Sequence, residues 1–209
     1  MKKIVCVMCG KEYEISNSKN SYLCLECTEK INLIKKLEMV DKAKIMLEKK
    51  RGKCRSLKPK IDVSNFADEV KKRVSDGTDA FSSVPETAVA IQMQKIGLEY
   101  ETQKEIAGKC VDFYIPEIKV ILEIDGEIYH TDDGKTFLRD RKIMSEIGES
   151  WEIVHIDAKD VPKYTWNLRE SLRYIVFERN DRWRFRDSLL DSDLLKESVN
   201  LNRYLKRSI

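Results

Sequence analysis

The sequence predicts an α/β fold, in which a mixed β-sheet is flanked by helices and preceded by a small cysteine-rich module and a helical linker. Three observations carry this prediction. Short apolar runs bounded by turn residues recur between residues 110 and 157 and are typical of buried strands. Segments with apolar residues at helical spacing lie before, between and after these runs. Two Cys-x-x-Cys pairs precede all of them.

The composition agrees with one main domain and an appendage, because 209 residues at 42% hydrophobic content can bury a core. The pattern divides the chain into a module at 1–28, a basic helix and linker at 29–60, a core at 61–180 and a helical tail at 181–209, whose role is not readable. The first residues form neither a signal peptide nor a membrane span, since their apolar run is too short. We therefore expect a cytoplasmic protein that has no membrane partner.

The first module is defined by cysteines. Cys6-x-x-Cys9 and Cys24-x-x-Cys27 are separated by 14 residues, a spacing at which a small hairpin can bring four thiolates around one tetrahedral Zn²⁺. This pattern predicts a zinc-ribbon-like module with a structural Zn²⁺. The alternative is a set of redox-active or incidental cysteines.

The next segment is basic. Ile31, Ile34, Leu37, Val40 and Ala43 recur at helical spacing, and residues 29–60 hold 12 Lys or Arg against 4 Asp or Glu, although the whole chain has a net charge of only +3. Such a block fits the phosphate backbone of DNA. The candidate DNA-binding residues here are Lys49, Lys50, Arg51, Lys53, Arg55, Lys58 and Lys60. A solvated lysine face on an ordinary packing helix is the alternative.

The core should begin with two helices. Apolar spacing predicts one helix within 61–74, and Ser83 and Pro85 predict the start of a second, which Gly97 ends. Glu86 then lies in the first turn of the second helix. On its own, an acid there is explained by the helix dipole.

A hairpin of two strands carries the carboxylates. Residues 110–115 and 118–125 read as strands joined by a turn at Pro116 and Glu117. A register symmetric about that turn places Asp112, Glu123 and Asp125 on one face and leaves the other face apolar, with Val111 beside Phe113. Carboxylates on such strands are costly to bury unless a cation neutralises them. An all-oxygen set suits Mg²⁺ or Mn²⁺.

Further helices and a strand complete the core. Residues 136–147 should form a helix with Phe137 and Ile143 toward the core, and Arg141 is a candidate for holding a phosphate or Asp140. A salt-bridged helix surface explains these charges equally well. Residues 151–157 read as a strand, in which His155 is interpreted as a satisfied core histidine, and 166–179 as a final helix.

Taken in order, Glu86, Asp112, the run Glu123-x-Asp125-Gly-x-x-Tyr-His130 and Asp140 resemble the PD-(D/E)XK nuclease superfamily. The similarity is to the Vsr-like branch, which comprises very-short-patch-repair-like enzymes and homing endonucleases with an E-D-x-H-D signature, and it covers about residues 84–178. It implies a restriction-endonuclease-like sheet and a catalytic set of Glu86, Asp112, His130 and Asp140, with Glu123 and Asp125 beside the metal. Asp125 stands where the superfamily usually has lysine, so His130, with an ordinary pKa of about 6.5, is the expected neutral-pH base or acid.

These observations predict a Mg²⁺- or Mn²⁺-dependent DNA endonuclease, with Asp112, Glu123 and Asp125 as metal ligands. Site-specific cutting of the homing, restriction or repair type is expected, on double-stranded DNA and with a homodimer as one possible assembly. The alternatives are a zinc-ribbon DNA-binding protein with a degenerate nuclease fold, or a junction-resolving or RNA-processing nuclease. A Cys/His nuclease is disfavoured because the chain has two histidines.

Overall fold

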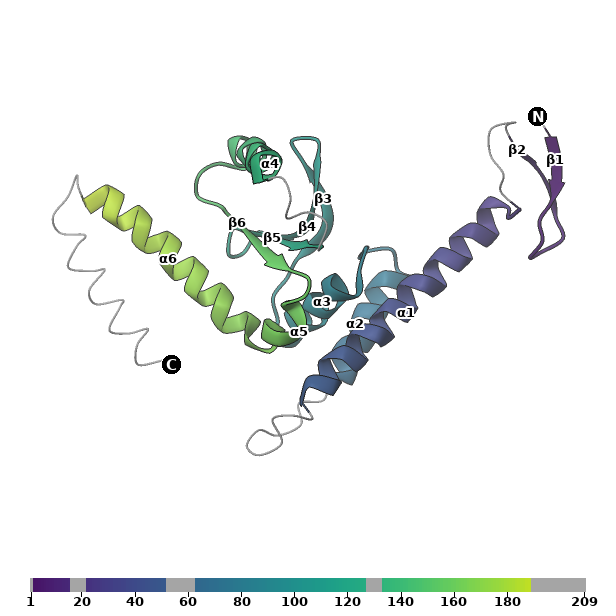
Figure 1. Cartoon of the computed structure of the whole chain (residues 1–209), viewed down its shortest axis with the longest axis horizontal. Helices are drawn as coiled ribbons and strands as arrows, with labels where there is room; N and C mark the ends of the chain where they lie inside the picture. The colour runs from purple at the N-terminus through teal and green to yellow at the C-terminus, as the bar shows by residue number, and fades with distance from the viewer. Residues whose placement is uncertain (1, 16–21, 52–62, 127–132, 189–209) are drawn as a thin grey trace.

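The computed structural model describes residues 2–15, 22–51, 63–126 and 133–188 (Figure 1). In these ranges, two short strands and three helices precede the central strands, and further helices lie between and after them. The elements are β1 (Lys2–Val5), β2 (Glu12–Ile15), α1 (Leu25–Arg51), α2 (Ser64–Ser75), α3 (Val84–Ile96), β3 (Glu101–Ile106), β4 (Lys109–Ile115), β5 (Val120–Asp125), α4 (Asp133–Ile147), β6 (Glu152–Asp157), α5 (Val161–Tyr164), the 3₁₀ turn η2 (Thr165–Asn167) and α6 (Leu168–Ser188).

The central sheet has the order β3-β4-β5-β6. Strands β3, β4 and β5 are antiparallel neighbours, whereas β6 runs parallel to β5. The connection between β5 and β6 contains α4, as a parallel pair requires a crossover. The prediction of an α/β chain with a mixed sheet flanked by helices is therefore confirmed.

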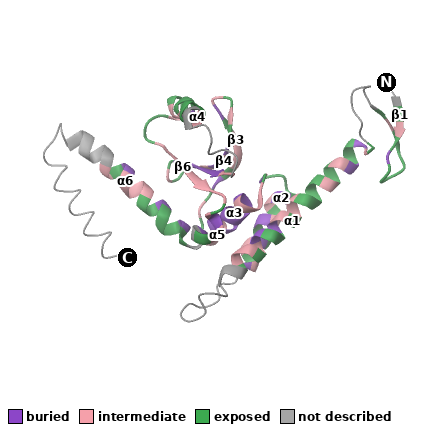
Figure 2. Cartoon of the chain, viewed as in Figure 1, coloured by how far each residue is buried: buried purple, intermediate pink, exposed green. Residues whose placement is uncertain are grey.

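Two apolar clusters cover the sheet. The larger one joins Phe113 and Leu122 to buried residues of α1, α2 and α3, and the purple of Figure 2 is concentrated on α3 and the strands beside it. The smaller cluster joins Ile121 of β5 to Ile143 of α4. Because neighbouring residues of a strand point to opposite faces, Ile121 and Leu122 place the sheet between α4 and the other helices.

The β4–β5 register differs from the prediction. The turn spans Pro116–Lys119, and Tyr114 pairs with Ile121, so the register is shifted by two residues. Lys119 takes a left-handed conformation with φ 51°, which lets the four-residue turn close. A shift of two residues leaves each side chain on its expected face.

Val111 is an exception to the predicted faces. It packs with Ile121 and Ile143 in the smaller cluster and not with Phe113 in the larger one. The paired residues of β4 and β5 extend from Ile115 only to Phe113. The strand therefore changes its side-chain orientation near Asp112, where that pairing ends.

Part of helix α1 packs into the apolar core, and part of it projects from the core. It begins at Leu25, between the two cysteines of the second pair, and continues to Arg51. Val40 and Ala43 are both 0% exposed and pack in the larger cluster with α2 and α3. The half of α1 nearer β1 and β2 projects from the core (Figure 1), and Ile34 there is 52% exposed.

The sequence signals at α3 are confirmed in detail. Ser83 is the N-cap and its side chain accepts a hydrogen bond from the backbone N–H of Glu86. Gly97 is the C-cap with φ 70°, a left-handed conformation that favours glycine. These caps fix the place of Glu86 in the first turn.

A buried ion pair attaches the turn after α2 to the start of β3. Asp79, whose side chain is 0% exposed, accepts hydrogen bonds from Arg73 Nε at 2.9 Å and Nη2 at 3.0 Å. Tyr100 Oη donates a third, at 3.0 Å. Since this carboxylate is fully buried, these three donors must compensate for the hydration that its negative charge loses.

No helix within the described ranges combines the length and the apolar character that a membrane span requires.

Candidate active site and cysteine cluster

Asp112 joins three strands at one end of the sheet. Its Oδ2 accepts a hydrogen bond from the backbone N–H of Ile124 at 2.8 Å, and its Oδ1 accepts one from Gln103 Nε2 at 3.2 Å. Since the paired residues of β4 and β5 end at Phe113, this carboxylate supplies the acceptor that the Ile124 N–H needs. Asp112 is thereby held beside Glu123.

Glu123 is a buried carboxylate, 5% exposed. Arg139 of α4 donates to its Oε1 at 2.6 Å and also donates to the carbonyl oxygen of Cys110 at 2.8 Å. Burial raises the pKa of Glu123 to about 7, and the charge of Asp112 adds to this rise although Arg139 opposes it. Arg139 therefore offsets only part of the cost of burying this carboxylate.

His155 lies between two of the predicted acids. Its Nδ1 is 2.9 Å from Asp125 Oδ2, and its Nε2 is 3.0 Å from Asp140 Oδ2. Two donated hydrogen bonds require a doubly protonated ring. Burial alone lowers the pKa of His155, but the hydrogen bond with Asp140 and the charges of both carboxylates outweigh it, so the pKa lies above its ordinary value.

Glu86 of α3 lies near enough to Asp112 for the charge of Asp112 to affect it. It is 5% exposed and accepts hydrogen bonds from the Ser82 backbone N–H at 2.8 Å and from Ser83 Oγ at 2.7 Å. Burial raises its pKa and the charge of Asp112 adds to the rise, whereas the two serine donors oppose it. Glu86 thus serves the helix start and also interacts electrostatically with Asp112.

The structure brings together most of the predicted catalytic residues. Asp112 neighbours Glu123, and Asp125 and Asp140 share His155. His130 lies outside the described residues. The roles of these side chains in a reaction stay a prediction.

Among the described residues, Arg141 makes no ion pair with Asp140, which the sequence had suggested as one of its partners. Arg141 is exposed, and its guanidinium lies 5.8 Å from the centre of the Phe137 ring. Phe137 itself is 61% exposed, so the prediction that it packs toward the core is wrong. Asp140 instead lies 3.6 Å from Arg139, whose guanidinium reaches the buried Glu123.

Two members of this site, Arg139 and His155, were not predicted from the sequence. His155 was interpreted as a core histidine, but its ring is hydrogen-bonded to two predicted site residues. The predicted strand at 151–157 could have pointed to His155. If that strand is placed parallel to β5, His155 is aligned with Glu123. Arg139 lies in a run of four charged residues, in which helical spacing alone does not show which side chain faces the sheet.

The donor set at Asp112 and Glu123 fits Mg²⁺ in its chemistry. Mg²⁺ takes one or two carboxylates and keeps several waters, and Asp112 and Glu123 supply two carboxylates near each other. The acids are not yet arranged as a multidentate cluster. Among the described residues, only the four cysteines bring three or more potential ligand atoms within 4.8 Å of one another.

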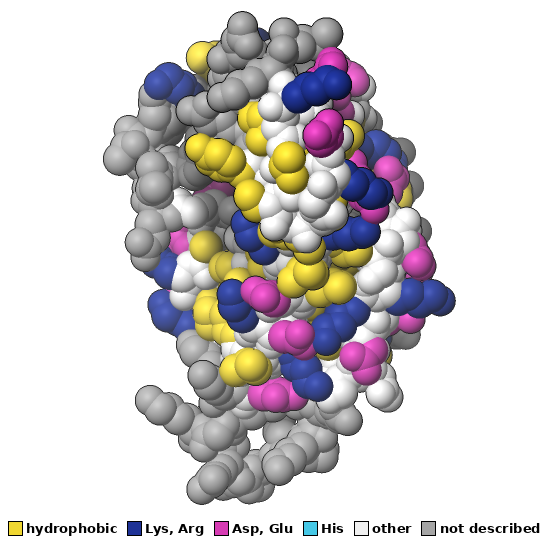
Figure 3. Space-filling model, turned by 90° about the vertical axis from the view of Figure 1, so that its right-hand side faces the viewer, with side chains coloured by type: hydrophobic (Ala, Val, Ile, Leu, Met, Phe, Trp, Pro, Cys, Tyr) yellow, Lys and Arg dark blue, Asp and Glu magenta, His cyan; other side chains and the backbone are white. Residues whose placement is uncertain are grey.

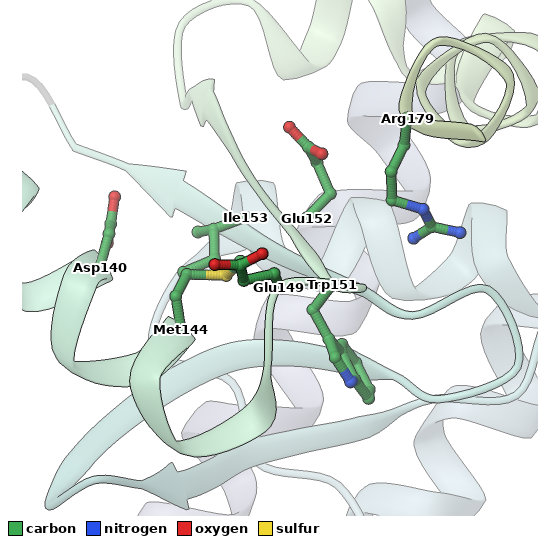
Figure 4. Close-up of a pocket in the computed structure, with 7 residues that line it drawn as sticks. All are labelled: Asp140, Met144, Glu149, Trp151, Glu152, Ile153 and Arg179. Atoms are coloured by element: carbon green, nitrogen blue, oxygen red, sulfur yellow. The ribbon is translucent and has the colours of Figure 1, made fainter. Parts of the chain in front are cut away.

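A cavity of about 300 Å³ lies beside Asp140, between α4, β6 and α6 (Figure 4). Its polar lining consists of Asp140, Glu149, Glu152 and Arg179. Asp140 Oδ1, which contributes to this region, is buried and has no hydrogen-bond partner among the described residues. The negative lining makes this cavity a poor place for a phosphate.

The four cysteines form the second candidate site. Cys6 and Cys9 belong to the loop of the β1–β2 hairpin, while Cys24 precedes α1 and Cys27 lies in its first turn. Cys9 Sγ and Cys24 Sγ are 3.7 Å apart, and a tetrahedral Zn²⁺ with Zn–S distances of about 2.3 Å separates its sulfurs by about 3.8 Å. The cluster could therefore hold a structural metal such as zinc.

The backbone around the cluster favours thiolates. The N–H of Cys24 points to Cys6 Sγ at 3.4 Å and is the main reason why the pKa of Cys6 is lowered to about 6. The second pair lies at the N-terminus of α1, but burial and then hydrogen bonds with the other three cysteines raise the pKa of Cys27 to about 12. The second pair thus belongs to a helix start, whereas the spacing alone had predicted a hairpin.

Charges are mixed around the first half of α1. Figure 3, which faces this end of the chain, shows Lys and Arg side chains interspersed with Asp and Glu and with hydrophobic side chains. Lys30 pairs with Glu26 at 2.9 Å and Lys42 with Glu38 at 4.0 Å. The basic excess therefore lies at the end of α1 and beyond it.

The candidate DNA-binding residues fall at the limit of the described chain. Lys49, Lys50 and Arg51 are the last residues of α1, and only their backbone is described. Lys53, Arg55, Lys58 and Lys60 lie outside the described residues. Their binding to DNA stays a prediction.

The comparisons with known proteins found a weak structural match. No family model and no curated protein sequence matches it. A solved structure, the catalytic domain of the homing endonuclease I-Bth0305I, matches with a TM-score of 0.32 and 18% identity, over 45% of this chain and 91% of that domain. At this TM-score the likeness is weak, and the chain is assigned to no family from it.

Proposed function

We propose that this protein is a metal-dependent DNA endonuclease that hydrolyses phosphodiester bonds. The observation that carries the proposal is the grouping of carboxylates on the sheet: Asp112, bonded to the Ile124 N–H, lies near the buried Glu123, whose pKa is raised, and Asp125 and Asp140 share His155. Ionisable groups with perturbed pKa values cluster at functional sites. The motif order that resembles PD-(D/E)XK nucleases of the Vsr-like branch agrees with this reading.

In this proposal Asp112 and Glu123 hold Mg²⁺ or Mn²⁺, with Asp125 nearby. A bound metal supplies positive charge for the phosphate and activates water. Arg139 supplies part of the charge that Glu123 needs and keeps this carboxylate in place. Glu86, held by Ser82 and Ser83, presents a carboxylate toward Asp112 that can orient a water.

The substrate we propose is double-stranded DNA, cut at specific sites in a homing, restriction or repair role, with a homodimer as the assembly that cuts both strands. The cysteine cluster, with structural zinc, and the basic residues 49–60 would extend the footprint beyond the cleavage site. His130 remains the proposed base or acid.

One observation favours the alternative of a DNA-binding protein with a degenerate site. Among the described residues the carboxylates do not form a metal-ready group, and Glu123 is already paired with Arg139. A bound metal would have to compete with Arg139 for the carboxylate of Glu123.

The test is cleavage of supercoiled, linear and branched DNA and of RNA by the full chain with Mg²⁺ or Mn²⁺. We expect cleavage of duplex DNA by the wild type and none by Asp112→Asn, which should still bind DNA. Glu105→Gln, which removes an exposed carboxylate from β3 of the same sheet, is the matched control and should cleave normally. Binding without cleavage under all conditions would favour the degenerate-site alternative.

A further inference from the structure

His155 links three elements that meet at the candidate site. The ring stands on β6, Asp125 on β5 and Asp140 on α4, and each ring nitrogen faces one carboxylate oxygen, at 2.9 Å and 3.0 Å. The side chain of His155 is 26% exposed, so the bridge is shielded from most of the solvent.

The register between β5 and β6 determines where the His155 side chain lies. Strand β6 runs parallel to β5 with His155 aligned with Glu123 and Asp157 aligned with Asp125. Side chains at aligned positions point to the same face of a sheet. The ring therefore emerges on the face that carries Glu123 and Arg139 and reaches diagonally to Asp125.

The bridge also opposes a repulsion. Asp125 and Asp140 place their Oδ2 atoms on opposite sides of one imidazole, and two such carboxylates repel each other in a partly buried site. A ring that donates to both offsets that repulsion and sets their separation. Without it, Asp140 loses the hydrogen bond that directs it from α4 toward the sheet.

We propose that His155 is a positioning residue, which holds Asp125 and Asp140 in a fixed arrangement beside Asp112 and Glu123. This inference rests on the proposed nuclease function. Partners that orient metal-site carboxylates change affinity or activity by about 10- to 100-fold when they are removed. The same size of effect is expected here.

The experiment measures kcat and KM for DNA cleavage by the full zinc-loaded chain and its variants. We expect His155→Ala to lower kcat by about 10- to 100-fold with little change in KM. His155→Asn and His155→Gln should each restore part of kcat, because Asn can replace the donor toward Asp125 and Gln the donor toward Asp140. Thr102→Ala on β3, which removes the hydroxyl that accepts a hydrogen bond from the Ala80 backbone N–H, is the control and should keep its kcat.

A double-mutant cycle separates positioning from a general loss of stability. If His155 acts through Asp140, adding His155→Ala to Asp140→Asn should lower kcat no further. Multiplicative effects on kcat, or a folded His155→Ala variant with normal kcat, would overturn the inference. Circular dichroism checks folding, and the Asn and Gln variants carry the test if the Ala variant does not fold.

A second readout does not depend on activity. Nitrogen-15 spectra of the histidine rings should show protons on both ring nitrogens of His155, assigned by their loss in His155→Gln. Asp125→Asn should perturb Nδ1 and Asp140→Asn should perturb Nε2. If the wild type cleaves no nucleic acid, the proposed function fails while these spectra still decide whether the bridge exists; a ring without both couplings overturns the inference.

Discussion

Replacing Glu123 by glutamine should remove a pH-dependent cost to stability. Burial raises the pKa of Glu123 from 4.5 to about 7. Between these values the folded chain keeps a proton that the unfolded chain has lost, so the free energy of unfolding falls as the pH rises. A rise of this size corresponds to about 3 kcal/mol, lost progressively between pH 4.5 and pH 7 and fully lost above it. The Glu123→Gln variant lacks this titration.

The assay is urea unfolding at several values between about pH 5 and pH 8, in a buffer that contains neither magnesium nor manganese and no chelator, so that a metal held by the cysteine cluster is not removed. The unfolding free energy of the wild type minus that of Glu123→Gln should fall by about 2–3 kcal/mol from the lowest to the highest pH, because part of the loss has already occurred at pH 5. His155 titrates in both proteins, so its contribution largely cancels in this difference. Glu105→Gln controls for the deletion of one negative charge.

A difference between wild type and Glu123→Gln that stays constant with pH would refute this reasoning. It would mean that Arg139, at 2.6 Å, compensates fully for the burial of the carboxylate. Addition of Mg²⁺ at the highest pH offers a further comparison. If Glu123 holds the metal, Mg²⁺ should stabilise the wild type more than the variant.

Three further predictions concern the rest of the chain. Asp79→Ala should lower the free energy of unfolding by about 3–5 kcal/mol in urea titrations, because it leaves buried donors without their carboxylate; a decrease below about 1 kcal/mol would contradict this. The full chain should carry one tightly bound zinc by elemental analysis, and Cys24→Ser should lose it; equal zinc content in both would exclude the cluster. Replacing the seven basic residues within 49–60 by glutamine should weaken DNA binding and reduce its dependence on salt. The slope of log affinity against log salt should fall in magnitude by about 0.9 for each phosphate that the variant no longer neutralises. An unchanged slope would favour the alternative of a solvated lysine surface. This substitution is preferable to deleting residues 1–60, which would also remove Val40 and Ala43 from the core.

Features that depend on neighbouring residues in the chain were predictable. Ser83 and Gly97 delimit α3 as expected, because caps act on hydrogen bonds within one helical turn. The two Cys-x-x-Cys pairs predicted the cluster that the structure contains. The side-chain period of strands placed Glu123 and Asp125 on the same face of β5.

Strand β3 was not predicted, because it has little apolar pattern. Its residues, Glu-Thr-Gln-Lys-Glu-Ile, lie at one edge of the sheet, and only Ile106 is buried. Such a strand is selected by its pairing with β4 and not by its own sequence. The burial of one half of α1 likewise depends on its packing against α2 and α3 and not on its own sequence.

By itself, then, the sequence determined the helices and strands around the site with the exception of β3, which carboxylates lie on β4 and β5, and which cysteines cluster. Tertiary structure alone decided the partners of those groups: Arg139 for Glu123, and His155 for Asp125 and Asp140. The physical reason is that periodicity is a local property of one chain segment, whereas the alignment of β6 with β5 and the approach of α4 join residues that are far apart in sequence. Those long-range alignments set the charge and the hydrogen bonds of the site.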